Sequence, residues 1–160
     1  MRRRLVLSSA FLAAAAFAVV GWLAMTASSP TPTGFEIVLV GSGQRIISDG
    51  DISYYNSTSN EFGLTAGCLG RIREMELYHQ AFEARLDGRF LNNGSFWADL
   101  DSMPPPGGLS LLDILAVQRG WSTSLRMEQC YPSGYSPNCT NPTFLEDLLI
   151  HFQNIGKLVH

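Results

Sequence analysis

An uninterrupted apolar segment near the N-terminus constrains this chain more than any other feature. Residues 5–25 form a run of 21 positions without a charged side chain, and Arg2, Arg3 and Arg4 precede it. A basic start followed by an apolar core is typical of an export signal. The run exceeds the roughly 7–15 residues of a cleaved signal core and matches the about 20 residues of a membrane-spanning helix, so it favours an uncleaved anchor. Small residues at positions 27–29 leave cleavage as the alternative.

The charges on either side of this segment predict its orientation. Glu36 is the first charged residue after it, whereas the three arginines lie before it. Because positively charged flanks tend to stay in the cytoplasm, we expect the rest of the chain to be exported. The predicted protein is single-pass in the cell membrane with its C-terminal domain outside, or secreted if the signal is cleaved. Its predicted parts are a signal anchor or signal peptide over residues 1–27, a linker over 28–34 and an extracytoplasmic domain over 35–160.

Two further features fit a location outside the cytoplasm. Three triplets match the pattern for N-glycosylation, at Asn56, Asn93 and Asn138. Cys130 and Cys139 enclose a turn-rich segment of eight residues, so we expect them to form a disulfide bond that leaves Cys68 over. The alternative is that all three cysteines are reduced.

The charge balance excludes one class of partner. Without the three N-terminal arginines the chain has 8 basic residues against 14 acidic ones, a formal charge of −6. Surfaces that bind nucleic acid need clustered Lys and Arg. We therefore expect no nucleic-acid partner.

Strand patterns dominate the exported part. Residues 35–40 read as a strand from their β-branched and aromatic content. Asp87-Gly88 is a strong hairpin signal between strands over residues 81–86 and 89–100. Residues 109–117 are apolar nearly throughout, which favours a central strand buried on both faces.

Two segments carry helix patterns. Thr65 is the predicted N-cap of one helix, and the second begins with Asn141 as cap and Pro142 at its first position and ends at Gly156. The predicted buried stripe of this second helix consists of Phe144, Leu145, Leu148, Leu149 and Phe152. Residues 48–56 are expected to hold one helical turn. We predict an α+β fold: an antiparallel or mixed sheet of about five strands with two packed helices, preceded by an N-terminal transmembrane or signal helix.

Patterns for catalysis and cofactor binding are missing. A dinucleotide site needs G-x-G-x-x-G at the start of a helix, but the third glycine position after Gly41 and Gly43 is Ile46. The three histidines, His79, His151 and His160, show no ligand spacing for a metal. We therefore expect no catalytic, cofactor-binding or metal-binding residues and no cofactor.

Aromatic residues supply the candidate binding surface. Trp97, Trp121, Tyr131 and Tyr135 lie in or beside predicted loops, where aromatic side chains bind sugars or partner proteins. Phe96 is instead expected to alternate into the core.

One segment has the layout of a known family. Residues 62–90 contain Leu-Thr before a helix, a strand, and Leu-Asp-Gly as a return turn, at Leu64, Thr65, Leu86, Asp87 and Gly88. This layout resembles part of the exported domain of SecD, a preprotein translocase subunit, and that of uncharacterised exported proteins of archaea and bacteria. The pattern usually has glycine where this chain has Cys68, and a proline after the turn that is absent here. The resemblance covers about a fifth of the chain and implies an exported α+β module.

The sequence therefore favours a non-catalytic domain over an enzyme. We expect it to be held at the membrane by its N-terminal helix, or secreted, and to bind or position an envelope protein or a glycan. One alternative is a secreted hydrolase whose acidic residues converge from separate strands. Another is an accessory protein of the export machinery.

Overall fold

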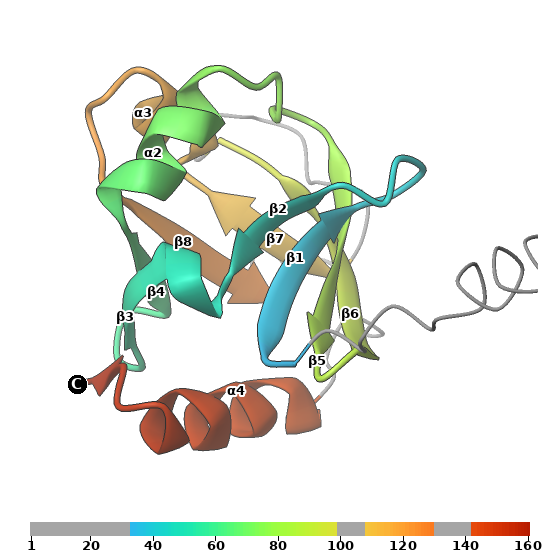
Figure 1. Ribbon diagram of the computed structural model, residues 1–160, viewed down its shortest axis with the longest axis vertical. Helices are drawn as coiled ribbons and strands as arrows, with labels where there is room; N and C mark the ends of the chain where they lie inside the picture. The colour runs from blue at the N-terminus through green and yellow to red at the C-terminus, as the bar shows by residue number, and fades with distance from the viewer. Residues whose placement is uncertain (1–32, 99–107, 130–141) are drawn as a thin grey trace, which may run out of the picture. The chain divides into compact units, whose positions relative to one another are not determined.

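One curled sheet forms most of the molecule. The structure is a computed structural model that describes residues 33–98, 108–129 and 142–160. Within these ranges nine strands follow the sheet order β2-β1-β5-β6-β7-β8-β4-β3-β9, with parallel pairs β6–β7 and β3–β9 and antiparallel pairs elsewhere (Figure 1). The strands are β1 (Phe35–Leu39), β2 (Arg45–Ser48), β3 (Ile52–Asn56), β4 (Glu61–Leu64), β5 (Ala81–Leu86), β6 (Arg89–Phe96), β7 (Leu109–Leu112), β8 (Ser124–Gln129) and β9 (Leu158–Val159).

Three small α-helices accompany the sheet in the described ranges. They are α2 (Ala66–Arg73), α3 (Ile114–Gln118) and α4 (Pro142–Asn154), and a single 3₁₀ turn, η1 (Asp49–Asp51), links β2 to β3. None of the helices in these ranges is long and apolar enough to span a membrane. The predicted leader over residues 1–27 lies outside the described residues.

The predicted α+β fold with about five strands and two helices is wrong. The part of the chain that the structure describes is mostly sheet, a nine-stranded half-barrel with three small helices. Two segments account for much of the difference. The apolar run over residues 109–117 is not one strand, because Asp113 adopts a left-handed φ of 69° that separates β7 from α3. Residues 48–56 hold the expected helical turn, as η1, but residues 52–56 form strand β3, which the sequence did not predict.

Contacts between distant strands demonstrate the curl. Phe35 of β1 and Phe62 of β4 stack with ring centroids 5.5 Å apart, although four strands separate β1 from β4 in the sheet order. In a flat sheet, five steps of about 4.8 Å would place these strands roughly 24 Å apart. The sheet must therefore bend until its two ends face each other.

The connection η1 holds the two ends of the sheet close together. It joins the edge strand β2 to β3 through only three residues, so four Cα steps of at most about 3.6 Å span the opening. Asp49 carries most of the contacts there. Its carboxylate accepts the backbone N–H of Phe35 at 3.2 Å and lies 2.8 Å from Nε2 of His151 in α4. Nζ of Lys157 donates to the carbonyls of Asp49 and Ile52.

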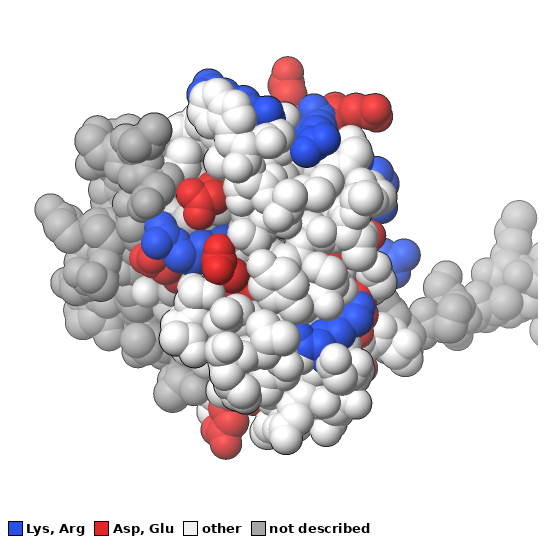
Figure 2. Space-filling view, turned by 90° about the vertical axis from the view of Figure 1, so that its left-hand side faces the viewer, with Lys and Arg blue, Asp and Glu red and all other residues white. Residues whose placement is uncertain are grey.

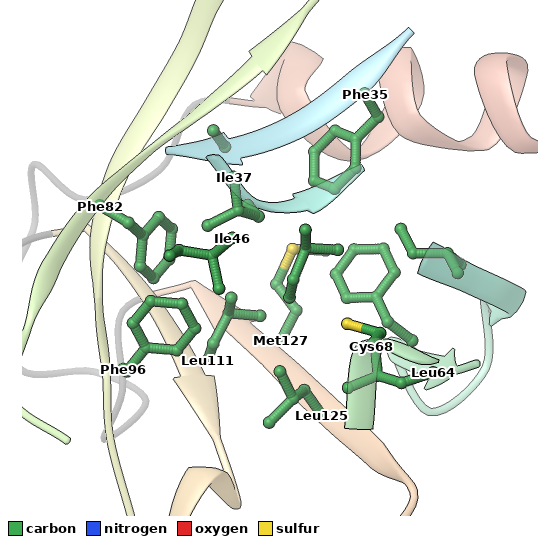
Figure 3. Packing of buried hydrophobic residues seen from close by; sticks show 14 of the residues in the cluster. Phe35, Ile37, Ile46, Leu64, Cys68, Phe82, Phe96, Leu111, Leu125 and Met127 are labelled. Atoms are coloured by element: carbon green, nitrogen blue, oxygen red, sulfur yellow. The ribbon is translucent and has the colours of Figure 1, made fainter. Parts of the chain in front are cut away.

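The concave face of the half-barrel holds the hydrophobic core. Side chains from β1 and β2 meet those from β5, β6, β7 and β8, as Figure 3 shows for Ile37, Ile46, Phe82, Phe96 and Leu111. Helix α4 closes this core with Phe152, whose ring lies 5.1–5.7 Å from those of Phe35, Tyr55 and Phe62. The interior is therefore filled by side chains from both ends of the sheet.

Several local predictions are confirmed. Asp87 and Gly88 form the β5–β6 hairpin turn with φ values of 52° and 73°, a backbone that glycine adopts without steric cost. Thr65 caps α2, since its side chain accepts the N–H of Cys68 at 3.4 Å. Helix α4 buries three members of its predicted stripe, Phe144, Leu148 and Phe152, and partly buries the other two, Leu145 and Leu149. Phe96 lies in the core, as expected.

The half-barrel has two distinct ends. The described chain enters beside Gly34, which exchanges hydrogen bonds with Asp87 of the β5–β6 hairpin, and α4 packs at the same end. We call this the entry end. Helices α2 and α3 lie together at the opposite end, which we call the α2–α3 end (Figure 1).

Candidate binding surface at the α2–α3 end

The two described tryptophans among the predicted surface residues have opposite environments. Trp121 is 75% exposed, in the connection between α3 and β8. Trp97 follows β6 and is only 5% exposed, so the prediction that it lies on a surface does not hold. The remaining predicted residues, Tyr131 and Tyr135, lie outside the described residues, as do Cys130, Cys139 and Asn138.

Trp97 is buried by the residues that precede β5. Its ring centroid lies 4.2 Å from that of His79, which stacks at 3.8 Å on Tyr78. The backbone of Trp97 also pairs on its other side, with Leu111 and with the first residue of α3, Ile114. Within the described part of the structure its Nε1 is buried without a hydrogen-bond partner. Trp97 therefore anchors the α2–α3 end from inside.

The backbone around Trp121 is held in place by α3. The N–H groups of Trp121 and Ser122 both donate to the carbonyl of Ala116, at 2.8 and 3.2 Å. The guanidinium carbon of Arg119 lies 5.0 Å from the centroid of the Trp121 ring, a cation–π contact. The short helix thus presents an exposed indole together with an arginine.

Helix α2 brings a second arginine to this turn. The side-chain amide of Gln118 donates to the carbonyls of Ile72 and Met75, and so fastens the C-terminus of α2 to α3. A Cβ atom placed on Gly120 would lie 3.4 Å from Nη2 of Arg73. The guanidinium of Arg73 therefore lies against the turn that carries Trp121.

Most described arginines form ion pairs with carboxylates, but Arg73 and Arg119 do not form one within the described ranges. Of the seven described arginines, four pair with carboxylates: Arg71 with Asp51, Arg85 with Glu83, Arg89 with Asp147 and Arg126 with Glu128. Arg45, Arg73 and Arg119 form no ion pair within the described ranges, and the last two flank Trp121. The face in Figure 2 shows scattered charges of both signs rather than a broad basic field.

Four of the described carboxylates are paired with arginines. The carboxylates of Asp51, Glu83, Asp147 and Glu128 each lie beside a different arginine. Burial alone would raise the pKa of Asp51, but hydrogen bonds from Arg71 and Ser48 outweigh it and lower that pKa below 3.8. No group of three or more His, Cys, Asp or Glu side chains in the described ranges is placed to hold a metal ion.

The surroundings of Cys68, Gly41 and Gly43 fit a role in the fold. Cys68 is fully buried on α2, and burial raises the pKa of its thiol to about 11, which disfavours the reactive thiolate. Gly41 and Gly43 have φ values of 89° and 68° and are followed by strand β2 instead of a helix. They form a turn without the free helix N-terminus that a pyrophosphate site needs.

Two predicted glycosylation sites lie in the described ranges. Asn93 is exposed on β6. Asn56 is half-buried at the end of β3, and its side-chain oxygen accepts the N–H groups of Thr58 and Ser59 at 2.8 and 3.1 Å. The Asn93 amide is thus the more accessible of the two.

The chain matches no protein-family model, no curated protein and no solved structure.

The sequence pointed to Trp121 but not to its two arginines. Arg119 lies two residues before Trp121, so the Arg-Gly-Trp order was the available signal. Arg73 is 48 positions before Trp121 and reaches the same turn only because α2 packs on α3. No local pattern predicts that contact.

Proposed function

We propose that this protein is a non-catalytic extracytoplasmic domain, anchored in the membrane or secreted, that binds or positions an envelope protein or a glycan. The observation that carries the proposal is Trp121, a large aromatic side chain left 75% exposed on a rigid turn. Burying such a surface favours association, and tryptophan with arginine is a frequent centre of binding sites. The α2–α3 end is the proposed binding surface.

Within the described residues, the proposed surface lies at the end of the half-barrel opposite Gly34, where the described chain enters (Figure 1).

The test compares two exposed apolar side chains in the full-length protein, expressed in its own cell envelope. Trp121→Ala removes the proposed contact, and Val40→Ala removes a 55% exposed side chain from the β1–β2 connection. We expect Trp121→Ala to lose the material that cross-links to or co-purifies with the unchanged protein, and Val40→Ala to retain it. Equal recovery from both variants would overturn the proposal. Recovery of translocase components with the unchanged protein would instead favour the export-accessory alternative.

A further inference from the structure

We infer that the Trp121 surface recognises an acidic glycan, one whose sugar rings carry carboxylate groups. This inference rests on the proposed function and deepens it by naming the ligand chemistry. Its basis is the combination of one exposed indole with two guanidinium groups that have no carboxylate partner in the described ranges, those of Arg73 and Arg119.

The size of the apolar area favours a sugar over a protein surface. A stable protein interface buries about 800 Å² on each partner around a well-packed apolar centre. The other exposed large apolar residues lie elsewhere in the fold: Val40 in the β1–β2 connection, Phe90 on β6, Ile150 on α4, and Ile155 and Val159 near the C-terminus. Among the described residues Trp121 is thus an isolated aromatic face, which suits stacking against a single ring.

The two arginines account for the carboxylate. A guanidinium binds a carboxylate through two parallel N–H donors, and such charge-assisted bonds are about twice as strong as neutral ones. Arg119 lies over the indole and Arg73 lies against Gly120, so both guanidinium groups are near the indole before a ligand binds. Nearby, Glu74 and Glu76 follow Arg73 in sequence, yet neither forms an ion pair with these arginines in the described structure.

Overall charge limits the length of ligand that is recognised. The exported part carries a formal charge of −6, so a long polyanion would be repelled away from this site. With two cations, we expect recognition of one or two neighbouring carboxylates. Nucleic acid, which requires many phosphate contacts, fits less well.

The test uses matched sugars and the full-length protein in detergent. Isothermal titration calorimetry measures the binding of trimers of galacturonate, mannuronate and glucuronate, and of the methyl esters of the same trimers. An ester keeps the ring and removes the charge. We expect at least one acid trimer to bind roughly tenfold more tightly than its ester, because a charge-assisted hydrogen bond contributes more than a neutral one.

Four variants measure how much individual side chains contribute to sugar binding. Arg73→Gln and Arg119→Gln should each weaken binding of the acid trimer several-fold and leave binding of its ester unchanged. Trp121→Ala should abolish binding of both. Arg45→Gln, which removes the third unpaired arginine from the start of β2, is the matched control and should change neither.

Each other outcome overturns the inference. Equal affinity for acid and ester would show that the carboxylate is not read, and the proposed binding function would remain. Binding of no acid trimer, or competition by inorganic phosphate at equal concentration, would reject an acidic glycan. A protein partner that is lost on Trp121→Ala, with no sugar bound, would keep the proposed function and reject this ligand. Survival of all binding in Trp121→Ala would reject both.

Discussion

Two tryptophans close to α3 show how the same residue type takes opposite roles. Trp97 lies inside the α2–α3 end and contacts His79, whereas Trp121 lies on its surface and contacts Arg119. The difference follows from the backbone. Trp97 continues from the end of β6, and its backbone bonds to Leu111 and Ile114, whereas Trp121 lies in the turn that follows α3.

We predict that these tryptophans differ sharply in their contribution to stability. Trp97→Ala should lower the free energy of unfolding by about 3–5 kcal/mol, because it empties a buried aromatic site. Trp121→Ala should change it by less than about 0.5 kcal/mol, since the side chain is exposed. Chemical denaturation followed by circular dichroism measures both values. A large loss in Trp121→Ala would mean that its ring supports the fold.

Two glycines give a second prediction at this scale. A Cβ on Gly94 would lie 2.2 Å from the carbonyl oxygen of Leu109 in the paired strand β7, whereas one on Gly67 in α2 would meet nothing within 4 Å. Gly94→Ala should therefore destabilise the protein, by about 1–3 kcal/mol. Gly67→Ala should stabilise it by roughly 0.5–1 kcal/mol, because alanine is the better helix former. The difference in melting temperature between the two variants tests this, and a tolerated Gly94→Ala would contradict the close packing of β6 on β7.

At the scale of elements, the sequence predicted what depends on neighbouring residues. The hairpin at Asp87-Gly88, the Thr65 cap and the apolar stripe of α4 each arise within a few residues, and each is present. The prediction of one strand over residues 109–117 is wrong, because apolar content alone does not distinguish a buried strand from a short buried helix. Only the left-handed backbone of Asp113 divides it.

Strand β9 shows why the strand count was too low. It has two residues and pairs with β3 from more than 100 positions away in the chain. Nothing in Leu158–Val159 itself predicts a strand, because its partner supplies the hydrogen bonds. The candidate surface has the same origin, since Arg73 reaches Trp121 only through the packing of α2 on α3.

The residue before β9 gives a prediction for the C-terminal elements. Nζ of Lys157 donates to two backbone carbonyls, of Asp49 and Ile52. Lys157→Met should keep the aliphatic stem but leave both carbonyls without this donor, at a cost of about 1–3 kcal/mol. His160→Ala, which removes a single exposed contact with Ser57, is the control and should cost less than about 0.5 kcal/mol. Urea denaturation of both variants measures the difference, and equal stabilities would argue against a role for Lys157 in closure.

At the scale of the whole molecule, the buried core predicts sensitivity to alkali. Burial raises the pKa of Tyr55 from 10.0 to about 12 and, together with the charge of Asp51, that of Cys68 from 9.0 to about 11. Both groups are neutral when protonated, and in the unfolded chain they lose their protons at lower pH. Their contribution to stability is therefore complete below about pH 9 and is lost as the pH rises from 9 towards 12.

Urea denaturation between pH 8 and pH 12 tests this. Tyr55→Phe should remove most of the fall in unfolding free energy above pH 10, which we expect to be about 2–3 kcal/mol for this residue. Cys68→Ala should flatten the curve between pH 9 and pH 11. An unaltered slope in Tyr55→Phe would show that its phenol is not the group responsible.

The three-residue link η1 has a consequence for how this molecule meets its surroundings. It limits how far strands β2 and β3 can separate, and aromatic rings already fill the interior of the half-barrel. Within the described residues the interior is filled by side chains, so a ligand of this part of the chain would contact its outer surface and not its core.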